Sequence, residues 1–188
     1  MKSIRWAIIL TLLVLLLSSC GTLRKVRAYL PFIKSAQVED GVTAKQWLSF
    51  AEDVARKWRS DVYLIGILDS TVDAEGKCQI WNYLFYSEAA DRAVQVNYEY
   101  GFINIKEKEI TPLPQIKDWK IDSPVAIKLA VLEGGGEKFV AENGVNSITA
   151  ALISGERNKK DSVYWAVRFY SDKDSLEVLL DANSGKIL

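Results

Sequence analysis

The side chains that most often carry out protein chemistry are scarce in this sequence, and histidine is absent. Its 188 residues include two cysteines. Without histidine the chain lacks the usual general base of serine and cysteine nucleophile systems and the commonest ligand of zinc. Acid–base chemistry would have to use carboxylates such as Asp69, Asp73 and Glu75, and nothing in the sequence brings these together. We therefore expect a protein that is not an enzyme and has no metal or cofactor.

Cys20 ends a segment that is typical of an export signal. Two basic residues, Lys2 and Arg5, begin the chain, the stretch 6–17 is almost wholly apolar, and a Leu-Ser-Ser-Cys sequence follows. A basic start, a short apolar core and small residues before a cleavage point indicate a secretory signal peptide. The apolar run is about a dozen residues, whereas a membrane-spanning helix needs roughly 20. Residues 1–19 are thus predicted to be a signal peptide.

The Leu-Ser-Ser-Cys sequence also resembles the lipobox of bacterial lipoproteins. The resemblance implies that Cys20 becomes the first residue of the mature chain and carries acyl chains that bind the membrane. Each buried methylene of such a chain contributes ~0.8 kcal/mol. An ordinary signal peptide with an incidental cysteine is the alternative. Gly21 replaces the acidic residue that some bacteria use for inner-membrane retention, so the cell membrane and the outer membrane both remain open as extracytoplasmic locations.

Residues 20–40 form the lipidated cysteine and a basic tether. Arg24, Lys25, Arg27 and Lys34 alternate with apolar residues, and no acid precedes Glu39. Such a segment suits an anionic membrane surface, and the alternative is a linker whose apolar residues dock on the domain. The whole chain is balanced, with 24 basic and 24 acidic side chains. It therefore lacks the charge that nucleic-acid binding requires.

Cys78 is the second thiol of the chain. If Cys20 is acylated, no disulfide can form within the chain. Cys78 follows a predicted turn at 73–77. A partly buried small residue is the ordinary interpretation, and an intermolecular disulfide is the alternative.

The sequence contains a repeat with a constant offset of 84 residues. Trp81, Phe85, Tyr86 and Ser87 recur as Trp165, Phe169, Tyr170 and Ser171, and the offset also matches Leu64 with Ile148 and Val94 with Val178. A match over about forty residues indicates a duplicated unit. We predict an α+β fold of two α-β-β-β units, 41–110 and 118–188, with helices packed on antiparallel sheets.

Each unit is expected to begin with a helix and continue with three strands. In the first unit Thr43 caps a helix that runs to Arg59, and strands cover 61–70, 79–87 and 93–105. In the second, Ser123 caps a helix that has Pro124 at its first position and ends at the glycines 134–136, and strands cover 145–154, 163–171 and 176–180. The turn Asp181–Gly185 is expected to be an Asx turn rather than a calcium loop.

The second unit resembles a PepSY domain, a small extracytoplasmic module. The resemblance lies in the apolar helix 126–130, the glycine break, and a hydrophobic–Asp–x–x–Ser–Gly–x–hydrophobic pattern that ends the chain with Asp181, Ser184 and Gly185. The first unit departs from it, because Asn97 replaces the Asp and Tyr100 the Ser. The resemblance implies a binding or restraining role toward other extracytoplasmic proteins, and no catalytic residues carry over.

Alternation along the strands indicates which face of each strand could bind a partner. Trp81 and Phe85, like Trp165 and Phe169, would face the helices, because residues four apart in a strand share a face. The opposite face would carry Tyr86, Tyr164, Arg168 and Tyr170, which are the types of residue that anchor protein interfaces. The alternatives are that two sheets cover each other or that they form one continuous sheet.

These observations predict a lipid-anchored, non-catalytic module that binds or regulates, in the manner of an inhibitor, another protein of the cell envelope. Two alternatives stay open: a structural or assembly lipoprotein, and a carrier of an apolar ligand in a cavity lined by Trp47, Trp81 and Trp165.

Overall fold

The computed structural model describes residues 41–99, 102–155 and 162–188. The predicted signal peptide, Cys20 and the basic tether lie outside the described residues. The elements are α2 (Leu48–Trp58), β1 (Tyr63–Val72), β2 (Asn82–Ser87), β3 (Arg92–Glu99), β4 (Phe102–Lys108), α3 (Ser123–Leu132), α4 (Gly136–Asn143), β5 (Ser147–Gly155), β6 (Ser162–Tyr170) and β7 (Ser175–Asp181).

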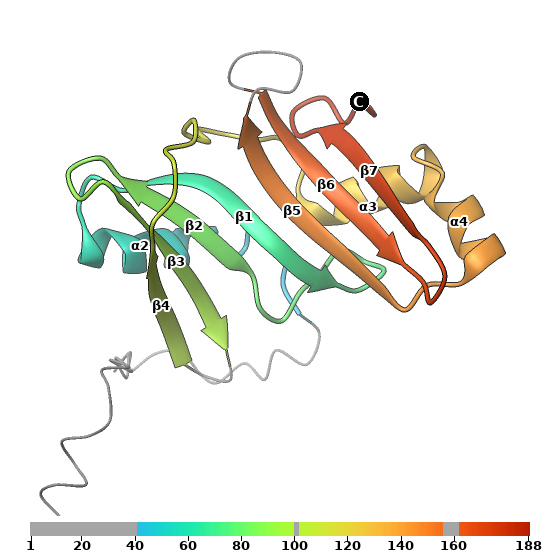
Figure 1. Cartoon of the computed structure of the whole chain (residues 1–188), viewed down its shortest axis with the longest axis horizontal. Coiled ribbons are helices and arrows are strands. Elements are labelled where there is room, and N and C mark those ends of the chain that lie inside the picture. Colours follow the sequence, from blue (N-terminus) through green and yellow to red (C-terminus); the bar gives the residue numbers. More distant parts are fainter. Residues whose placement is uncertain (1–40, 100–101, 156–161) are drawn as a thin grey trace, which may run out of the picture.

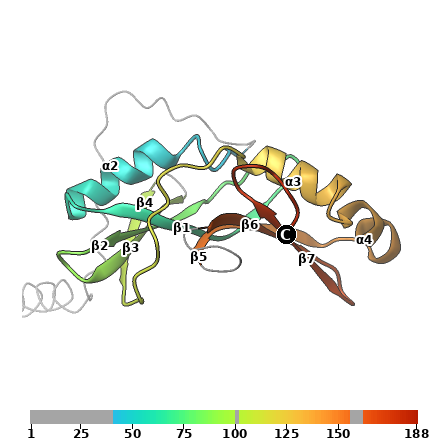
Figure 2. The same cartoon turned by 90° about the horizontal axis from the view of Figure 1, so that it is seen from above.

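The strands form a single antiparallel sheet, and the helices lie on one of its faces. The strand order is β4-β3-β2-β1-β5-β6-β7, so β1 pairs with β2 on one side and with β5 on the other (Figure 1). Figure 2 shows α2, α3 and α4 on the same side of the sheet. The predicted α+β class is therefore confirmed, and of the arrangements left open, the structure has one continuous sheet.

The predicted strand at 93–105 is wrong, because the chain reverses within it. Glu99 pairs with Phe102, and the hairpin continues to the pair Ala93 and Lys108. The first half of the sheet thus has four strands instead of three. Period-two alternation continues through the turn, so the pattern hid the break. The stretch contains one glycine, Gly101, and glycine is typical of hairpin connections.

The glycines at 134–136 do more than end a helix, because a further helix, α4, follows them. The ideal Cβ of an alanine at Gly134 would lie 2.4 Å from Val178 Cγ1, and one at Gly136 would lie 2.8 Å from Phe169 Cζ. Gly135 has a φ of 86°, which favours glycine. The turn between α3 and α4, which we call the elbow, therefore packs closely against β6 and β7. Short helices such as α4 are hard to predict from sequence.

Both predicted helix caps are displaced. α2 begins only at Leu48, and its N-cap position is Trp47 instead of Thr43. α3 is capped by Asp122, whose carboxylate accepts a hydrogen bond from the backbone N–H of Ser123. The Ser123 hydroxyl is used elsewhere, since its Oγ accepts a hydrogen bond from Ala44 N at 3.1 Å. The hydrogen bond from Ala44 therefore uses the hydroxyl that the sequence pattern assigned to the N-cap of α3.

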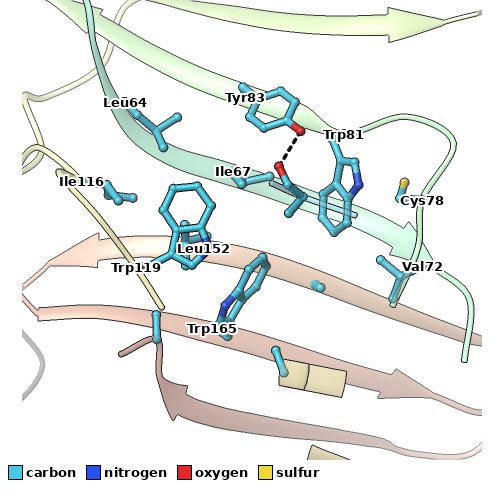
Figure 3. Close-up of a cluster of buried hydrophobic side chains, with 14 of the residues drawn as sticks. Leu64, Ile67, Val72, Cys78, Trp81, Tyr83, Ile116, Trp119, Leu152 and Trp165 are labelled. Atoms are coloured by element: carbon cyan, nitrogen blue, oxygen red, sulfur yellow. Dashed lines mark hydrogen bonds between the residues drawn. The ribbon is translucent and has the colours of Figure 1, made fainter. Parts of the chain in front are cut away.

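The core between the helices and the sheet contains side chains from both halves of the chain. Trp81 and Trp165 are 3% and 0% exposed, and their ring centroids lie 6.4 Å apart in an edge arrangement. Trp119, from the segment that links β4 to α3, is buried beside them (Figure 3). The Tyr83 hydroxyl donates to the carbonyl of Ala44 at 2.8 Å, which fixes the approach to α2 (Figure 3).

We predict that Gly134→Ala destabilises the protein, because the added methyl group meets Val178 and the carbonyl oxygen of Ala130, 2.7 Å away. Overpacking of this kind costs about 1–3 kcal/mol. Gly155→Ala is the matched control, since nothing lies within 4 Å of its Cβ position, and we expect a change within about 0.5 kcal/mol. Denaturant unfolding measures both, and equal effects would contradict the close packing of the elbow.

Candidate functional site: the uncovered face of the sheet

The two faces of the sheet carry different side chains, and the predicted assignment of β2 and β6 to these faces is confirmed. Trp81, Phe85, Trp165 and Phe169 belong to the core beneath the helices. Leu84 and Tyr86 belong to a second, smaller cluster, which packs on the opposite face. No helix among the described residues covers that opposite face (Figure 2). We call it the open face.

Tyr86 lies on the open face, but its side chain is only 3% exposed. It packs with Ile65, Leu84 and Ala93, and Ile110 from the segment after β4 packs against the same cluster. The Tyr86 hydroxyl donates to the carboxylate of Asp91, and this hydrogen bond raises the pKa of the phenol to about 12. The predicted accessibility of Tyr86 is therefore wrong, and we remove it from the candidate contact residues.

The other three candidates lie together on β6. Tyr164, Arg168 and Tyr170 alternate with the core residues Trp165 and Phe169, so all three side chains point to the open face. Tyr170 is 36% exposed, while Tyr164 and Arg168 are half-buried. Their role in binding a partner stays a prediction. The structure shows that they share one strand and one face.

Arg168 is held by two carboxylates on different strands. Its Nε donates to Glu177 Oε2 on β7 at 2.6 Å, and its Nη1 donates to Asp69 Oδ2 on β1. β5 lies between β1 and β6, so the arginine reaches across a strand and connects the two halves of the sheet. Hydrogen bonding to Glu177 raises the pKa of the guanidinium above its usual value. The charge of Arg168 is therefore largely balanced within the molecule.

The half of the open face that lies over β2 and β3 carries a polar network instead. Asn82 Oδ1 accepts hydrogen bonds from Gln95 Nε2 at 2.7 Å and from Asn97 Nδ2 at 2.8 Å. On the other side of β1, the same row of the sheet continues with Ala151 on β5 and Ala166 on β6, which are buried. The open face thus carries an amide network beside the Leu84–Tyr86 cluster on β2 and β3, and small apolar and aromatic residues on β5 and β6.

The three carboxylates considered for acid–base chemistry line one open hollow at the end of β1, together with Lys77, Cys78 and Asn82. No sequence motif predicted that Asp69 would lie beside Asp73 and Glu75. Asp69 pairs with Arg168, Asp73 Oδ1 accepts from the backbone N–H groups of Glu75 and Lys77, and Glu75 pairs with Lys77 at 2.9 Å. Each carboxylate has a structural partner. Among the described residues, no cluster of three or more acidic or cysteine side chains could hold a metal ion.

Cys78 is buried, with 5% of its surface exposed, as the ordinary interpretation of its position predicted. Its Sγ accepts from Ile80 N at 3.2 Å and lies 3.1 Å from Ile80 O. Burial raises the pKa of the thiol. An intermolecular disulfide would require this end of the sheet to open, so the position disfavours that alternative.

Close packing fills the space proposed for an apolar ligand. Trp81 and Trp165 contact each other directly. A hollow next to Trp47, Phe50 and Trp81 has a volume of about 10 Å³, which is roughly what one water molecule needs. Trp165 does not line it. This hollow has no room for an apolar ligand.

Comparisons with known proteins provide little further information. No family model matches the chain, and no curated protein matches it. A crystal structure described as that of a "putative lipoprotein" from Clostridium difficile 630 is similar, with a TM-score of 0.49 and 12% identity over 75% of this chain and 89% of that chain. The similarity is too low to carry an argument about function. No described helix is long and apolar enough to cross a membrane.

We predict that Arg168→Gln lowers the free energy of unfolding by about 1 kcal/mol, because two partly exposed ion pairs are lost together. The loss should shrink at high salt, which screens such pairs. Arg56→Gln is the control, since Arg56 makes one exposed ion pair, with Glu52 one turn away, and such pairs contribute about 0.3–0.5 kcal/mol. A double-mutant cycle with Asp69→Asn measures the coupling. Zero coupling would contradict the bridge across β5.

We also predict that Cys78 reacts slowly with thiol reagents in the native protein and rapidly after unfolding. Burial limits access to the sulfur, and the raised pKa reduces the fraction of thiolate, the reactive form. Raising the pH should speed the native reaction, because the thiolate fraction grows with pH. The rate of labelling with a chromogenic disulfide, with and without denaturant, tests this. Equal rates in both conditions would show that the end of β1 is open.

Proposed function

We propose that the chain is an extracytoplasmic lipoprotein, anchored by acylated Cys20, and that its folded part is a non-catalytic binding module for another protein of the cell envelope. The leader supports the anchor: a basic start, a short apolar run and a Leu-Ser-Ser-Cys sequence precede a basic tether. The fold supports binding rather than catalysis, because the candidate carboxylates are engaged in turns and ion pairs. In this role the tether holds the module near its partner.

The module consists, in this proposal, of two units that arose by duplication. The strand orders β3-β2-β1 and β7-β6-β5 support it, as do the pairs Leu64–Phe85 and Ile148–Phe169, which differ by 84 residues at both members. The indole nitrogens of Trp81 and Trp165 each donate at 2.8 Å to a carbonyl in the segment before a helix. The ungapped offset ends in the third strand, since Phe85 pairs with Val94 but Phe169 with Leu176.

The PepSY resemblance of the second unit rests on motif residues alone, and its turn has a clear physical purpose. Asp181 Oδ1 accepts hydrogen bonds from the backbone N–H groups of Asn183 and Ser184 and from the Ser184 hydroxyl. Gly185 follows with a φ of 76°. The expected Asx turn is thus present, and the carbonyl of Ala182 accepts from Lys120 and Ile121 just before α3. The motif ties the chain end to the helix, a structural role compatible with a binding module.

The observation that carries the proposal is the one-sided covering of the sheet. A seven-stranded sheet with helices on one face presents the other face as a broad surface. On that face Tyr164, Arg168 and Tyr170 form a stripe next to the buried alanines 151 and 166. Aromatic side chains and arginine are enriched at the centres of protein interfaces. Arg168 is already fixed by Glu177 and Asp69, so a partner would meet a preorganised surface.

We predict that a photoreactive amino acid at Tyr170, in the full-length protein in living cells, forms a crosslink to one dominant envelope protein. The matched control is Lys57, an exposed position on α2 at the other face. Mass spectrometry of the products identifies the partner. A Cys20→Ala variant, tested in parallel, should lose membrane association and most of the crosslink, because the tether no longer concentrates the module.

Two results would contradict this proposal. The first is a Tyr170 probe that gives no product beyond those of the Lys57 control. The second is a native chain whose Cys20 carries no acyl group, which mass spectrometry of the mature N-terminus detects directly.

A further inference from the structure

The outward surface of α3 is unusually apolar for a helix on a protein surface. Ser123 and Lys128 are its only polar residues. Ala126, Ile127 and Ala130 face the core, so Val125, Lys128 and Leu132 form the opposite ridge. Val125 is 45% and Leu132 60% exposed. A helix with so few polar residues is normally buried, which indicates that this ridge, apolar except for Lys128, is covered in the working protein.

The outward surface of α2 is charged, so the apolar outward surface is not shared by all the helices. Asp53, Arg56 and Lys57 point outward from α2 and are exposed, and Arg56 pairs with Glu52 at 2.7 Å. On α4 the outward residues Lys138 and Glu142 form an ion pair as well. α4 exposes one large apolar side chain, Val140, so α3 is the described helix that carries two of them on one ridge.

The chain reaches α3 directly from the tether. Gly41 is the first described residue, and four residues later the Lys45 N–H donates to Asp122 Oδ1, the N-cap of α3, at 3.1 Å. Ala44 N donates to Ser123 in the first turn of the same helix. Only residues 21–40 separate Gly41 from Cys20, a length that spans at most about 70 Å. A lipid surface is thus always within reach of α3.

We propose that the ridge of α3, formed by Val125, Lys128 and Leu132, rests on the lipid surface to which the chain is anchored. This inference rests on the proposed acylation of Cys20. Val125 and Leu132 would enter the interfacial region, and Lys128 between them would meet anionic headgroups, as basic residues do at such surfaces. α3, rather than the charged outer surface of α2, then contacts the membrane, and the open face of the sheet points away from it, toward a partner.

The test measures which side of the lipid-anchored protein contacts the bilayer. Single cysteines replace Val125, Leu132, Lys57 or Tyr170 in the full mature chain, in which Cys78→Ala removes the other free thiol and acylated Cys20 does not react. Each cysteine carries the environment-sensitive fluorophore NBD. The proteins are anchored in vesicles of phosphatidylethanolamine and phosphatidylglycerol that contain brominated acyl chains, which quench only fluorophores at the lipid. All four sites are exposed, and thermal melting confirms that the variants fold.

We expect several-fold stronger quenching at positions 125 and 132 than at 57 and 170. Equal quenching at all four sites, or the strongest quenching at 170, overturns the proposal. So does a label at 132 that becomes shielded from water without bromine quenching, because that result indicates a second copy of the chain on the ridge. An unlabelled chain that fails to float with the vesicles overturns the lipid anchor itself. A chain that floats but shows uniform quenching overturns the orientation alone.

Discussion

The pairing of β1 with β5 is the contact on which the rest of the structure depends. It joins two sets of strands, each consecutive in sequence, into one sheet. The approach is close: a Cβ at Gly66 would lie 3.2 Å from the carbonyl oxygen of Leu152, and the Ser154 hydroxyl donates to the carbonyl of Ile65. Without this pairing, β1 and β5 would each be an exposed edge, which is a hazard for aggregation. With it, one core can run beneath both halves.

The continuous sheet explains why the helices and linker are arranged as they are. The Trp81–Trp165 contact lies near the junction, and residues 44–45 reach across to the first turn of α3. The linker after β4 starts on the open face, where Ile110 packs, and ends in the main core, where Ile116 and Trp119 are buried. It therefore connects the two clusters, and Ile116 N donates to the carbonyl of Leu64 at 2.8 Å on the way. Both halves are tied together by contacts that are distant in sequence.

One-sided covering leaves the protein with two surfaces of different character. The open face is stabilised locally, by the Arg168 bridge over β5 and by the amide network of Asn82. The helical side has a charged surface on α2 and an apolar ridge on α3. An anchored protein that uses one surface for the membrane and the other for a partner would need this division. In the proposed role, the fold would assign these two contacts to opposite faces of the sheet.

Sequence alone determined the features that depend on local periodicity. The alternation in 81–87 and 163–171 identified the inward face of β2 and β6, because side chains in a strand alternate by geometry. The offset of 84 residues predicted the matching hairpins, and the glycine at 185 predicted the turn. The basic and apolar pattern of residues 2–17 and the absence of histidine are also properties of the sequence by itself.

Only the tertiary structure decided which of those features are accessible. Tyr86 lies on the open face, as the alternation of side chains predicted, and yet it is buried, because Ile110 from a distant segment packs against its cluster. Asp69 is 99 residues from Arg168, and only the order of the strands brings their charges together. α4 likewise depends on packing against β6 and β7. Burial and long-range pairing depend on how the helices and strands pack against each other, and local sequence patterns do not encode that packing.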